Sequence, residues 1–233
     1  VQGGWDKRMN VWEYFIIGGS PDIVSVTPNS PYTSLQDLVT AAKASPKSIK
    51  AGASASGSIH HLNLLGFEKG AGIQLNFIPY TGSAPAQNAA MTGEVTVVIT
   101  SVQEQSELLK AGKLRPLAVL VPKAFKFGDK TFPSAFDQYP EMTKHLPLEQ
   151  QIGFAIRRDA PEPVKAKLRE AFAVAMKATP VRDFGEKMYF NLSGLTGDTA
   201  NTIFDKLESQ FGWILWELGA AKVDPAKLGI PKP

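Results

Sequence analysis

Two short loops of small and hydroxyl-bearing residues are the parts of this sequence best suited to bind a ligand. They are Ser54-Ala55-Ser56-Gly57-Ser58 and Tyr80-Thr81-Gly82-Ser83, and each precedes a helical pattern. Free backbone N–H groups and the positive end of the helix dipole favour an anion at such a helix start. Small polar residues also cap helices without any ligand, so either loop taken alone is explained by capping. Two such loops on neighbouring strand ends favour a binding site.

The charges around these loops narrow the kind of ligand. Between residues 51 and 103 the only charged residues are Glu68, Lys69 and Glu94, so neither loop contains a lysine or an arginine. A nucleic-acid backbone requires clustered basic side chains, and the net charge of +3 is spread along the chain. We therefore predict no nucleic-acid partner. We expect a small carboxylate bound by backbone N–H groups, hydroxyl groups and water.

The residues that could support catalysis or metal binding are few. His60 and His61 lie near serines, which would suit a Ser–His pair. However, adjacent residues of a helix point about 100° apart, and the G-x-S-x-G nucleophile motif is absent. The two histidines lack further metal ligands at a useful spacing, and the chain has no cysteine. We predict no enzymatic activity, no cofactor and no metal.

A β-α-β-α-β unit is predicted to position the two loops. Short strands are expected at about 49–53, 74–78 and 95–99, with a helix after each of the first two strands. Ligands of open parallel sheets bind beyond the carboxyl ends of the strands. Both loops are therefore expected at one edge of an α/β sheet.

The domain organisation is predicted to be discontinuous. The chain has 233 residues, of which 43% are hydrophobic, enough for one large or two small domains. Parallel β-α units occupy the middle, and long amphipathic helices follow. We predict a central ligand-binding domain at 26–114, inserted in an outer domain formed by 1–25 and 115–233. Strands at 22–26 and 114–121 would be the two crossings, and therefore a hinge that closes on a small ligand.

Four local patterns give further expectations. Thr33, with Gln36 three residues later, predicts a capping box at the start of a helix. Pro116 cannot donate a hydrogen bond to a neighbouring strand, so its strand is predicted to lie at a sheet edge or to carry a break. The segment 122–151 contains several prolines and little periodicity, which indicates an irregular connection with one short helix near 134–138. No run of eighteen apolar residues occurs, so no membrane insertion is predicted.

Several motifs occur in the order and spacing of a known family. They are P-Y-T-S-L-Q-D-L-V-T-A-A-K-A-S-P, A-S-A-S-G-S-I-H-H-L, I-P-Y-T-G-S-A-P-A, M-T-G-E-V-T-V-V-I and A-G-K-L-R-P-L-A-V-L, all within about 22–121. The pattern R-R-D-A-P-E-P-V-K-A-K-L and two helices continue the similarity to about residue 221. The chain resembles the tripartite tricarboxylate transporter substrate-binding proteins, also called the Bug or TctC family.

This resemblance implies a fold and a function. The fold is the type II periplasmic-binding-protein fold, with two α/β domains joined by two crossing strands. The function is that of a periplasmic solute-binding protein without enzyme activity. It captures a small organic carboxylate in a hinged cleft and delivers it to membrane transporter subunits.

The resemblance also implies which residues contact the ligand. In the family, the central domain contributes both loops and the position after the third strand, which is often Asp-Asn and here is Thr100-Ser101. The loss of a charge at Thr100 favours a ligand without a cationic amine, which argues against amino acids. His60 begins the helix behind the first loop. The implied ligand-binding residues are Ser54, Ala55, Ser56, Gly57, Ser58, His60, Tyr80, Thr81, Gly82, Ser83, Thr100 and Ser101.

Some questions stay open at this point. Members of the family usually have about a hundred further residues before this region, including a glycine-rich loop that grips the carboxylate. We therefore expect the outer domain to be incomplete at its N-terminus, because the chain is a fragment, because that part is missing from the structure, or because another chain supplies it. Residues 1–6 lack the features of a secretory signal, so any signal peptide is expected to have been removed.

The ligand and the role of the receptor also stay open. A dicarboxylate, a tricarboxylate and an aromatic acid would all suit uncharged loops. The alternative function is a ligand-sensing module that presents a carboxylate to a regulator or a sensor kinase. A regulator of this kind would need a DNA-binding helix-turn-helix, and no such pattern is visible in the sequence.

Overall fold

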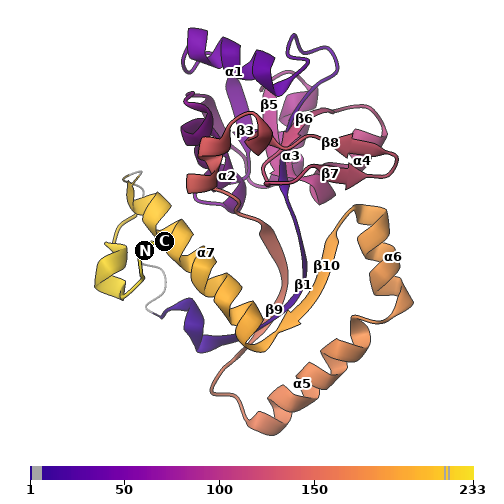
Figure 1. Ribbon diagram of the computed structural model, residues 1–233, viewed down its shortest axis with the longest axis vertical. Helices are drawn as coiled ribbons and strands as arrows, with labels where there is room; N and C mark the ends of the chain where they lie inside the picture. The colour runs from indigo at the N-terminus through magenta and orange to yellow at the C-terminus, as the bar shows by residue number, and fades with distance from the viewer. Residues whose placement is uncertain (2–6, 218, 220) are drawn as a thin grey trace. The chain divides into compact units, whose positions relative to one another are not determined.

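The chain forms two compact units in the computed structural model (Figure 1). Unit 1 comprises 1–19 and 151–233, and unit 2 comprises 20–150. The structure describes residues 1, 7–217, 219 and 221–233. Residues 2–6 lie outside the described residues. They belong to the predicted outer domain and to the N-terminal stretch that lacks the features of a signal peptide.

The units divide at other positions than the sequence suggested. The predicted boundaries at 25/26 and 114/115 both lie inside unit 2, whose limits are Ser20 and Gln150. The reason is strand pairing, because the strands proposed as hinge crossings are hydrogen-bonded to each other in one sheet. Residues 20–25 and 115–150 therefore belong to the same unit as the two loops.

Unit 2 is built on a five-stranded sheet with strand order β4-β3-β5-β2-β6. As predicted, β3 runs parallel to β4 and β5, whereas β2 is antiparallel to both β5 and β6. The strands β3, β4 and β5 therefore end where β2 begins, and we call this end of the sheet the carboxyl edge. The strands are β2 (Asp22–Val26), β3 (Lys50–Ala53), β4 (Asn76–Pro79), β5 (Val97–Ser101) and β6 (Arg115–Val119). The edge position predicted for β6 from Pro116 is confirmed.

Helices connect these strands and begin near the carboxyl edge. The crossovers from β3 to β4 and from β4 to β5 run in opposite directions across the sheet. Because such crossovers are right-handed, their helices α2 and α3 lie on opposite faces. Helix α4 follows β5 directly. The bounds are α2 (Ile59–Ala71), α3 (Ser83–Met91) and α4 (Val102–Lys110).

Helix α1 (Leu35–Ala44) begins one residue later than predicted. Its N-cap is Ser34, whose hydroxyl accepts the Asp37 amide at 3.1 Å, and the Asp37 carboxylate accepts the Ser34 amide at 2.9 Å. Thr33 donates to the same carboxylate through its hydroxyl at 2.7 Å. The predicted capping box therefore forms one residue later, and the side chain that accepts the N-cap amide is Asp37 instead of Gln36.

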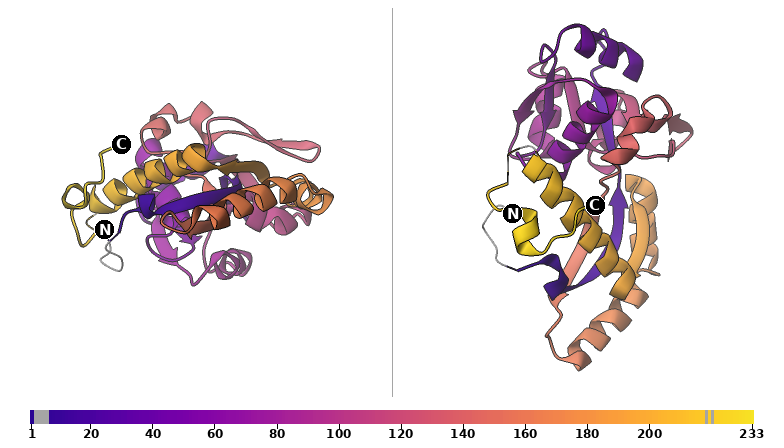
Figure 2. Two further views of the ribbon diagram at one scale, coloured as in Figure 1. Left: turned by 90° about the horizontal axis from the view of Figure 1, so that it is seen from below. Right: turned by 60° about the vertical axis from the view of Figure 1, so that its left-hand side comes forward.

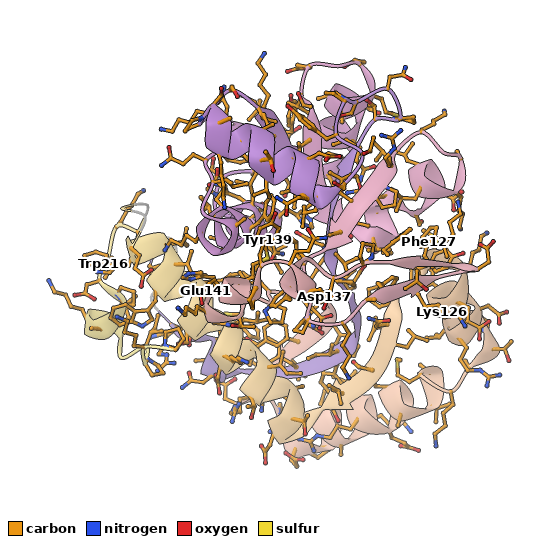
Figure 3. All side chains as sticks on the ribbon, turned by 45° about the horizontal axis from the view of Figure 1, so that its top comes forward. Lys126, Phe127, Asp137, Tyr139, Glu141 and Trp216 are labelled. Atoms are coloured by element: carbon orange, nitrogen blue, oxygen red, sulfur yellow. The ribbon has the colours of Figure 1, made fainter. Side chains whose placement is uncertain are left out.

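The segment after β6 is more regular than predicted. It contains a hairpin of β7 (Phe125–Phe127) and β8 (Lys130–Phe132), then the 3-10 helices η2 (Ala135–Asp137) and η3 (Pro140–Lys144). Strands of three residues are too short to show a periodic pattern. Tyr139, labelled in Figure 3, donates its hydroxyl to Gln36 of α1 at 3.1 Å, which fixes this segment to unit 2.

Two glycines allow α2 to approach the η3 segment closely. A Cβ atom on Gly70 would lie 2.3 Å from Met142 Cγ and 2.7 Å from its Cα. A Cβ atom on Gly66 would lie 2.6 Å from Leu146 Cδ2. Met142 is fully buried in this contact. The helix that follows the first loop therefore packs closely against the η3 segment.

Unit 1 contains a three-stranded sheet with strand order β10-β1-β9. Tyr14 stacks on Phe204 of helix α7 at 3.8 Å, and Phe15 stacks on Phe154 at 4.6 Å. The two ends of the chain meet here, since the carbonyl of Val1 accepts the amides of Lys222 and Val223 (Figure 2). The elements are η1 (Met9–Val11), β1 (Trp12–Ser20), β9 (Gln150–Arg157), α5 (Glu162–Ala175), α6 (Thr179–Met188), β10 (Asn191–Thr196), α7 (Gly197–Glu217) and η4 (Pro225–Leu228). Among the described residues, no helix is both long and apolar enough to cross a membrane.

Candidate functional site

The carboxyl edge of unit 2 brings together three helix starts. Ser58 caps α2 by accepting the amide of His61, and Ser101 caps α4 by accepting the amide of Glu104. Gly82 precedes α3 without any side-chain cap. Because the first amides of a helix have no acceptor within it, three sets of N–H donors point toward this edge. Both predicted loops therefore lie at the carboxyl edge of the sheet, as expected for an open parallel sheet.

The first loop is held by its own hydrogen bonds. Ser54 and Ser58 share a bond of 2.8 Å between their hydroxyl oxygens, and the Ser58 amide donates to Ala55 at 2.9 Å. Gly57 has a φ of +80°, a left-handed conformation that glycine adopts without strain. Ala55 and Ser56 are exposed at the tip. The loop thus presents a fixed backbone and one free serine to solvent.

His61, and not His60, supports this loop directly. The amide of Gly57 donates to His61 Nδ1 at 3.0 Å, so the neutral ring carries its proton on Nε2. The ring stacks on Phe77 of β4 with 4.1 Å between centroids. Burial lowers the pKa of His61, which keeps the ring neutral at physiological pH. The sequence showed two adjacent histidines but not which of them faces the loop.

The second loop leaves its backbone donors available. Thr81 is exposed, Gly82 and Ser83 are partly exposed, and Pro85 has no amide hydrogen. Ser83 and Ala84 therefore supply the uncapped N–H groups in the first turn of α3.

The side chain of Tyr80, which was predicted to contact the ligand, points toward Glu94. Its hydroxyl donates to Glu94 at 2.8 Å, and Glu94 precedes the amino end of β5, away from the carboxyl edge. Its ring lies 3.1 Å from the position of a Cβ on Gly52. Burial and the bond to Glu94 raise the pKa of Tyr80 to about 12. The side chain therefore packs along the sheet and leaves only its backbone near the second loop.

The residues after the third strand are buried. Thr100 has no exposed surface, and its hydroxyl accepts the side-chain amides of Gln87 and Gln105 at 3.1 Å each. Ser101 is equally buried and serves as the cap of α4. The prediction that Thr100 faces the ligand is wrong for its side chain, because that side chain points between α3 and α4. The argument against amino-acid ligands loses its basis with it.

His60 is a buried positive charge. It is 3% exposed, and its Nδ1 lies 2.8 Å from both carboxylate oxygens of Asp22. Its Nε2 lies 3.2 Å from the carboxylate of Glu104. Burial alone would lower the pKa of His60, but the two carboxylates raise it to about 10. The side chain is therefore a structural link beneath the loops and is not exposed to a ligand.

Glu104 was not predicted from the sequence. Its carboxylate accepts the Ser101 amide at 3.1 Å and the Ser101 hydroxyl at 2.7 Å. Burial alone would raise the pKa of Glu104, but His60 and the nearby serine hydroxyls lower it to about 2. The pattern Ser101-x-x-Glu104 is a capping box, a signal that could have identified the residue.

Asp22, the first residue of β2, belongs to the same network of hydrogen bonds and ion pairs as His60 and Glu104. It accepts the side-chain amide of Asn63 at 2.9 Å, and the same amide donates to the carbonyl of Leu148 at 2.9 Å. The network thus joins β2, α2 and α4. Among the described residues, no group of three or more potential ligands could hold a metal ion.

Known structures share the fold of this chain. Rpa4515 from R. palustris, solved with adipate, superposes with a TM-score of 0.81 at 22% identity, covering 95% of this chain and 73% of that one. MatC from Rhodopseudomonas palustris, solved with bound malate, gives a TM-score of 0.75 at 16% identity over 86% of this chain and 68% of that one. The predicted two-domain α/β fold of periplasmic binding proteins is confirmed.

Sequence comparison identifies the family within this class. The profile of the tripartite tricarboxylate transporter family receptors (TctC) matches residues 5–216, and the chain belongs to this family, as its motifs predicted. Protein BugT of Bordetella pertussis is 30% identical over 179 residues, which is 71% of this chain and 53% of BugT. The chain therefore spans about half the length of this curated relative.

Proposed function

We propose that this chain binds a small organic carboxylate at the carboxyl edge of unit 2, for delivery to a tripartite tricarboxylate-type transporter. The observation that carries the proposal is the pair of exposed loops at two helix starts. Both offer backbone N–H groups and hydroxyls, and neither contains a basic side chain. Membership of a receptor family supports a binding role without catalysis, in the periplasm.

The twelve predicted residues divide into two groups under this proposal. Residues 54–58 and 81–83 form the binding loops, in which the exposed Ser56 and Thr81 and the amides that begin α3 contact the carboxylate. His60, Thr100 and Ser101 are buried beneath those loops, and the Tyr80 side chain bonds to Glu94 away from them. Adipate and malate, which the two R. palustris proteins carry, are both dicarboxylates. We therefore infer that a dicarboxylate is the ligand to test before tricarboxylates and aromatic acids.

A carboxylate screen tests the proposal. The purified protein is heated with succinate, malate, adipate, citrate or benzoate, and the unfolding temperature is measured. A ligand present at 100 times its Kd stabilises the folded state by about 2.7 kcal/mol, which is readily measured. If no acid stabilises the protein, the binding proposal is contradicted. Turnover of an ester or amide substrate would instead indicate an enzyme.

Replacing Ser56 with aspartate is expected to weaken carboxylate binding at least tenfold. Ser56 is exposed at the tip of the first loop, so the substitution adds a negative charge without disturbing a buried contact. At roughly 5 Å, two like charges repel by about 3 kcal/mol at an effective dielectric constant of 20. Isothermal titration with the acid found in the screen measures the change.

Asn88→Asp provides the matched control. Asn88 is exposed in the second half of α3, where the same added charge lies away from the helix start. We expect it to change the Kd by less than a factor of about two. Equal loss of affinity in both variants would indicate a general charge effect and would move the ligand away from the first loop.

A further inference from the structure

A small pocket opens on unit 2 beside the hairpin of β7 and β8. It has a volume of about 240 Å³ and lies where the end of α4, the start of β6 and the hairpin meet. Four buried apolar side chains line it, namely Leu109, Leu114, Phe127 and Phe132. The rings of Phe127 and Phe132 stack with 4.8 Å between their centroids. The pocket is therefore an apolar hollow whose hairpin side is already ordered.

Two cations flank this apolar lining. Arg115 is partly buried, and its guanidinium donates to the carbonyls of Tyr32 at 3.3 Å and Pro28 at 2.6 Å. Lys130 is exposed on β8. Within the part of the chain that the structure describes, no carboxylate lines the pocket or forms an ion pair with Arg115 or Lys130. Both positive charges are therefore available to an anion that approaches the pocket.

The surface around the pocket is strongly basic. Residues 107–130 contain six basic and two acidic side chains, a net charge of +4, whereas the whole chain carries +3. One of the two acids, Glu107, is already paired with Lys110 at 2.9 Å. Lys126, labelled in Figure 3, extends the basic surface along the hairpin. The net positive charge is therefore concentrated here, although basic residues occur along the whole chain.

The position and size of the pocket separate it from the candidate carboxylate site. Arg115 begins β6 and pairs with Val26, the last residue of β2, whereas the carboxyl edge is the end where β2 begins. The pocket is also smaller than the roughly 300–1,000 Å³ that is typical of sites enclosing a small molecule. It suits a single anchoring side chain, and a few such anchors in pockets carry most of the binding energy of protein interfaces.

We propose that this pocket docks an acidic segment of a protein partner, which inserts an apolar side chain beside the hairpin and places a flanking carboxylate against Arg115 and Lys130. The apolar side chain is stabilised by leaving water, and the carboxylate by charge-assisted hydrogen bonds to the two cations. The wider basic surface speeds the approach of an acidic partner and disfavours a basic one. This inference is independent of the proposed function, because the pocket lies at the other end of the sheet.

Four end-blocked tripeptides test the proposal on the wild-type chain, namely Glu-Phe-Glu, Gln-Phe-Gln, Glu-Ala-Glu and Lys-Phe-Lys. Binding is followed by the amide chemical shifts in NMR titrations. Glu-Phe-Glu is expected to shift the amides of 109–116 and 125–132. It should bind at least about fivefold more tightly than the other three, because it alone supplies both the anchor and the negative charge. Equal affinity of Gln-Phe-Gln, shifts confined to other parts of the chain, or no binding at all would overturn the proposal.

A charge reversal at the pocket provides a second test. Lys130→Glu is expected to weaken the binding of Glu-Phe-Glu at least about tenfold at an ionic strength of about 0.15 M. Lys50→Glu is the matched control, because Lys50 is exposed at the start of β3 and does not line the pocket. The control is expected to change the Kd less than about twofold, since salt screens distant charges. Equal weakening by both variants would indicate a general charge effect and overturn the proposal.

Anionic vesicles distinguish a protein partner from a membrane surface. Vesicles of phosphatidylglycerol and phosphatidylcholine attract basic surfaces without any need for an apolar pocket. Binding of Glu-Phe-Glu, together with equal sedimentation of the wild type and Lys130→Glu with these vesicles, supports the proposal. If Lys130→Glu sediments less than the wild type and Glu-Phe-Glu does not bind, the surface is a lipid-binding one and the proposal is overturned.

Discussion

Replacing His60 with glutamine is expected to destabilise unit 2 by about 3–5 kcal/mol, the usual cost of removing one partner from a buried ion pair. The substitution leaves the carboxylates of Asp22 and Glu104 close together without the cation between them. Asp22 is 1% exposed, so water cannot replace the lost partner. Hydrogen exchange of the unit 2 amides, measured at increasing denaturant concentration, gives the loss.

His61→Gln is the matched control for this prediction. The side chain of His61 accepts the Gly57 amide and stacks on the ring of Phe77, and burial lowers its pKa. Its replacement is expected to cost about 1 kcal/mol, the contribution of one ordinary hydrogen bond. The double variant Asp22→Asn/His60→Gln should recover part of the stability lost in His60→Gln. Equal destabilisation by both histidine variants would contradict the role assigned to the buried cation.

The stabilising effect of His60 is expected to depend on pH. Folding raises the pKa of His60 from its ordinary 6.5 to about 10, so the stabilisation is complete below pH 6.5 and is lost as pH rises toward 10. Folding lowers the pKa of Glu104 from 4.5 to about 2, so its contribution is complete above pH 4.5 and is lost as pH falls toward 2. The difference in unfolding free energy between the wild type and His60→Gln should therefore be largest between pH 4.5 and 6.5. A difference that does not decrease from pH 6.5 to 9.5 would show that His60 is neutral in the folded protein.

Replacing Gly153 with alanine is expected to destabilise unit 1 by about 3 kcal/mol, at the upper end of the usual cost of overpacking. Gly153 lies in β9, and a Cβ atom there would be 1.9 Å from the carbonyl oxygen of Phe15 and 3.1 Å from the Cα of Ile16. Both atoms belong to the backbone of β1, which cannot rotate away as a side chain can. The two strands must separate, and their hydrogen bonds must weaken. Faster amide exchange along β1 and β9, with a lower unfolding temperature, is the expected result.

Gly212→Ala makes the same chemical change without the contact. Gly212 lies in α7, and its added Cβ would be 3.5 Å or more from the nearest atom, an ordinary van der Waals distance. Alanine is also favoured over glycine in a helix by about 1 kcal/mol. This variant should be as stable as the wild type or more so. If both variants behave alike, the strand contact at Gly153 is not the cause of the destabilisation.

The order of elements in unit 2 could be predicted because each one leaves a local pattern. Ser58 and Ser101 lie where a hydroxyl caps a helix, and both act as caps. Pro116 correctly indicated an edge strand. The short strands β7 and β8 left no such pattern, because three residues do not define a period. The domain boundaries predicted near 25 and 115 depended on strand partners, which local patterns do not encode.

The sequence by itself determined the family, the parallel β-α-β-α-β unit and the two uncharged loops at its carboxyl edge. Each of these depends on residues that are neighbours in the chain, through their spacing, capping and backbone freedom. Only the tertiary structure decided that His60 is buried, that His61 supports the loop and that Glu104 supplies the charge at the edge. His60 and Asp22 are 38 positions apart, and no local pattern connects them. Sheet order brings the two together, because the antiparallel strand β2 begins where the parallel strands end, and the resulting ion pair sets which histidine faces inward.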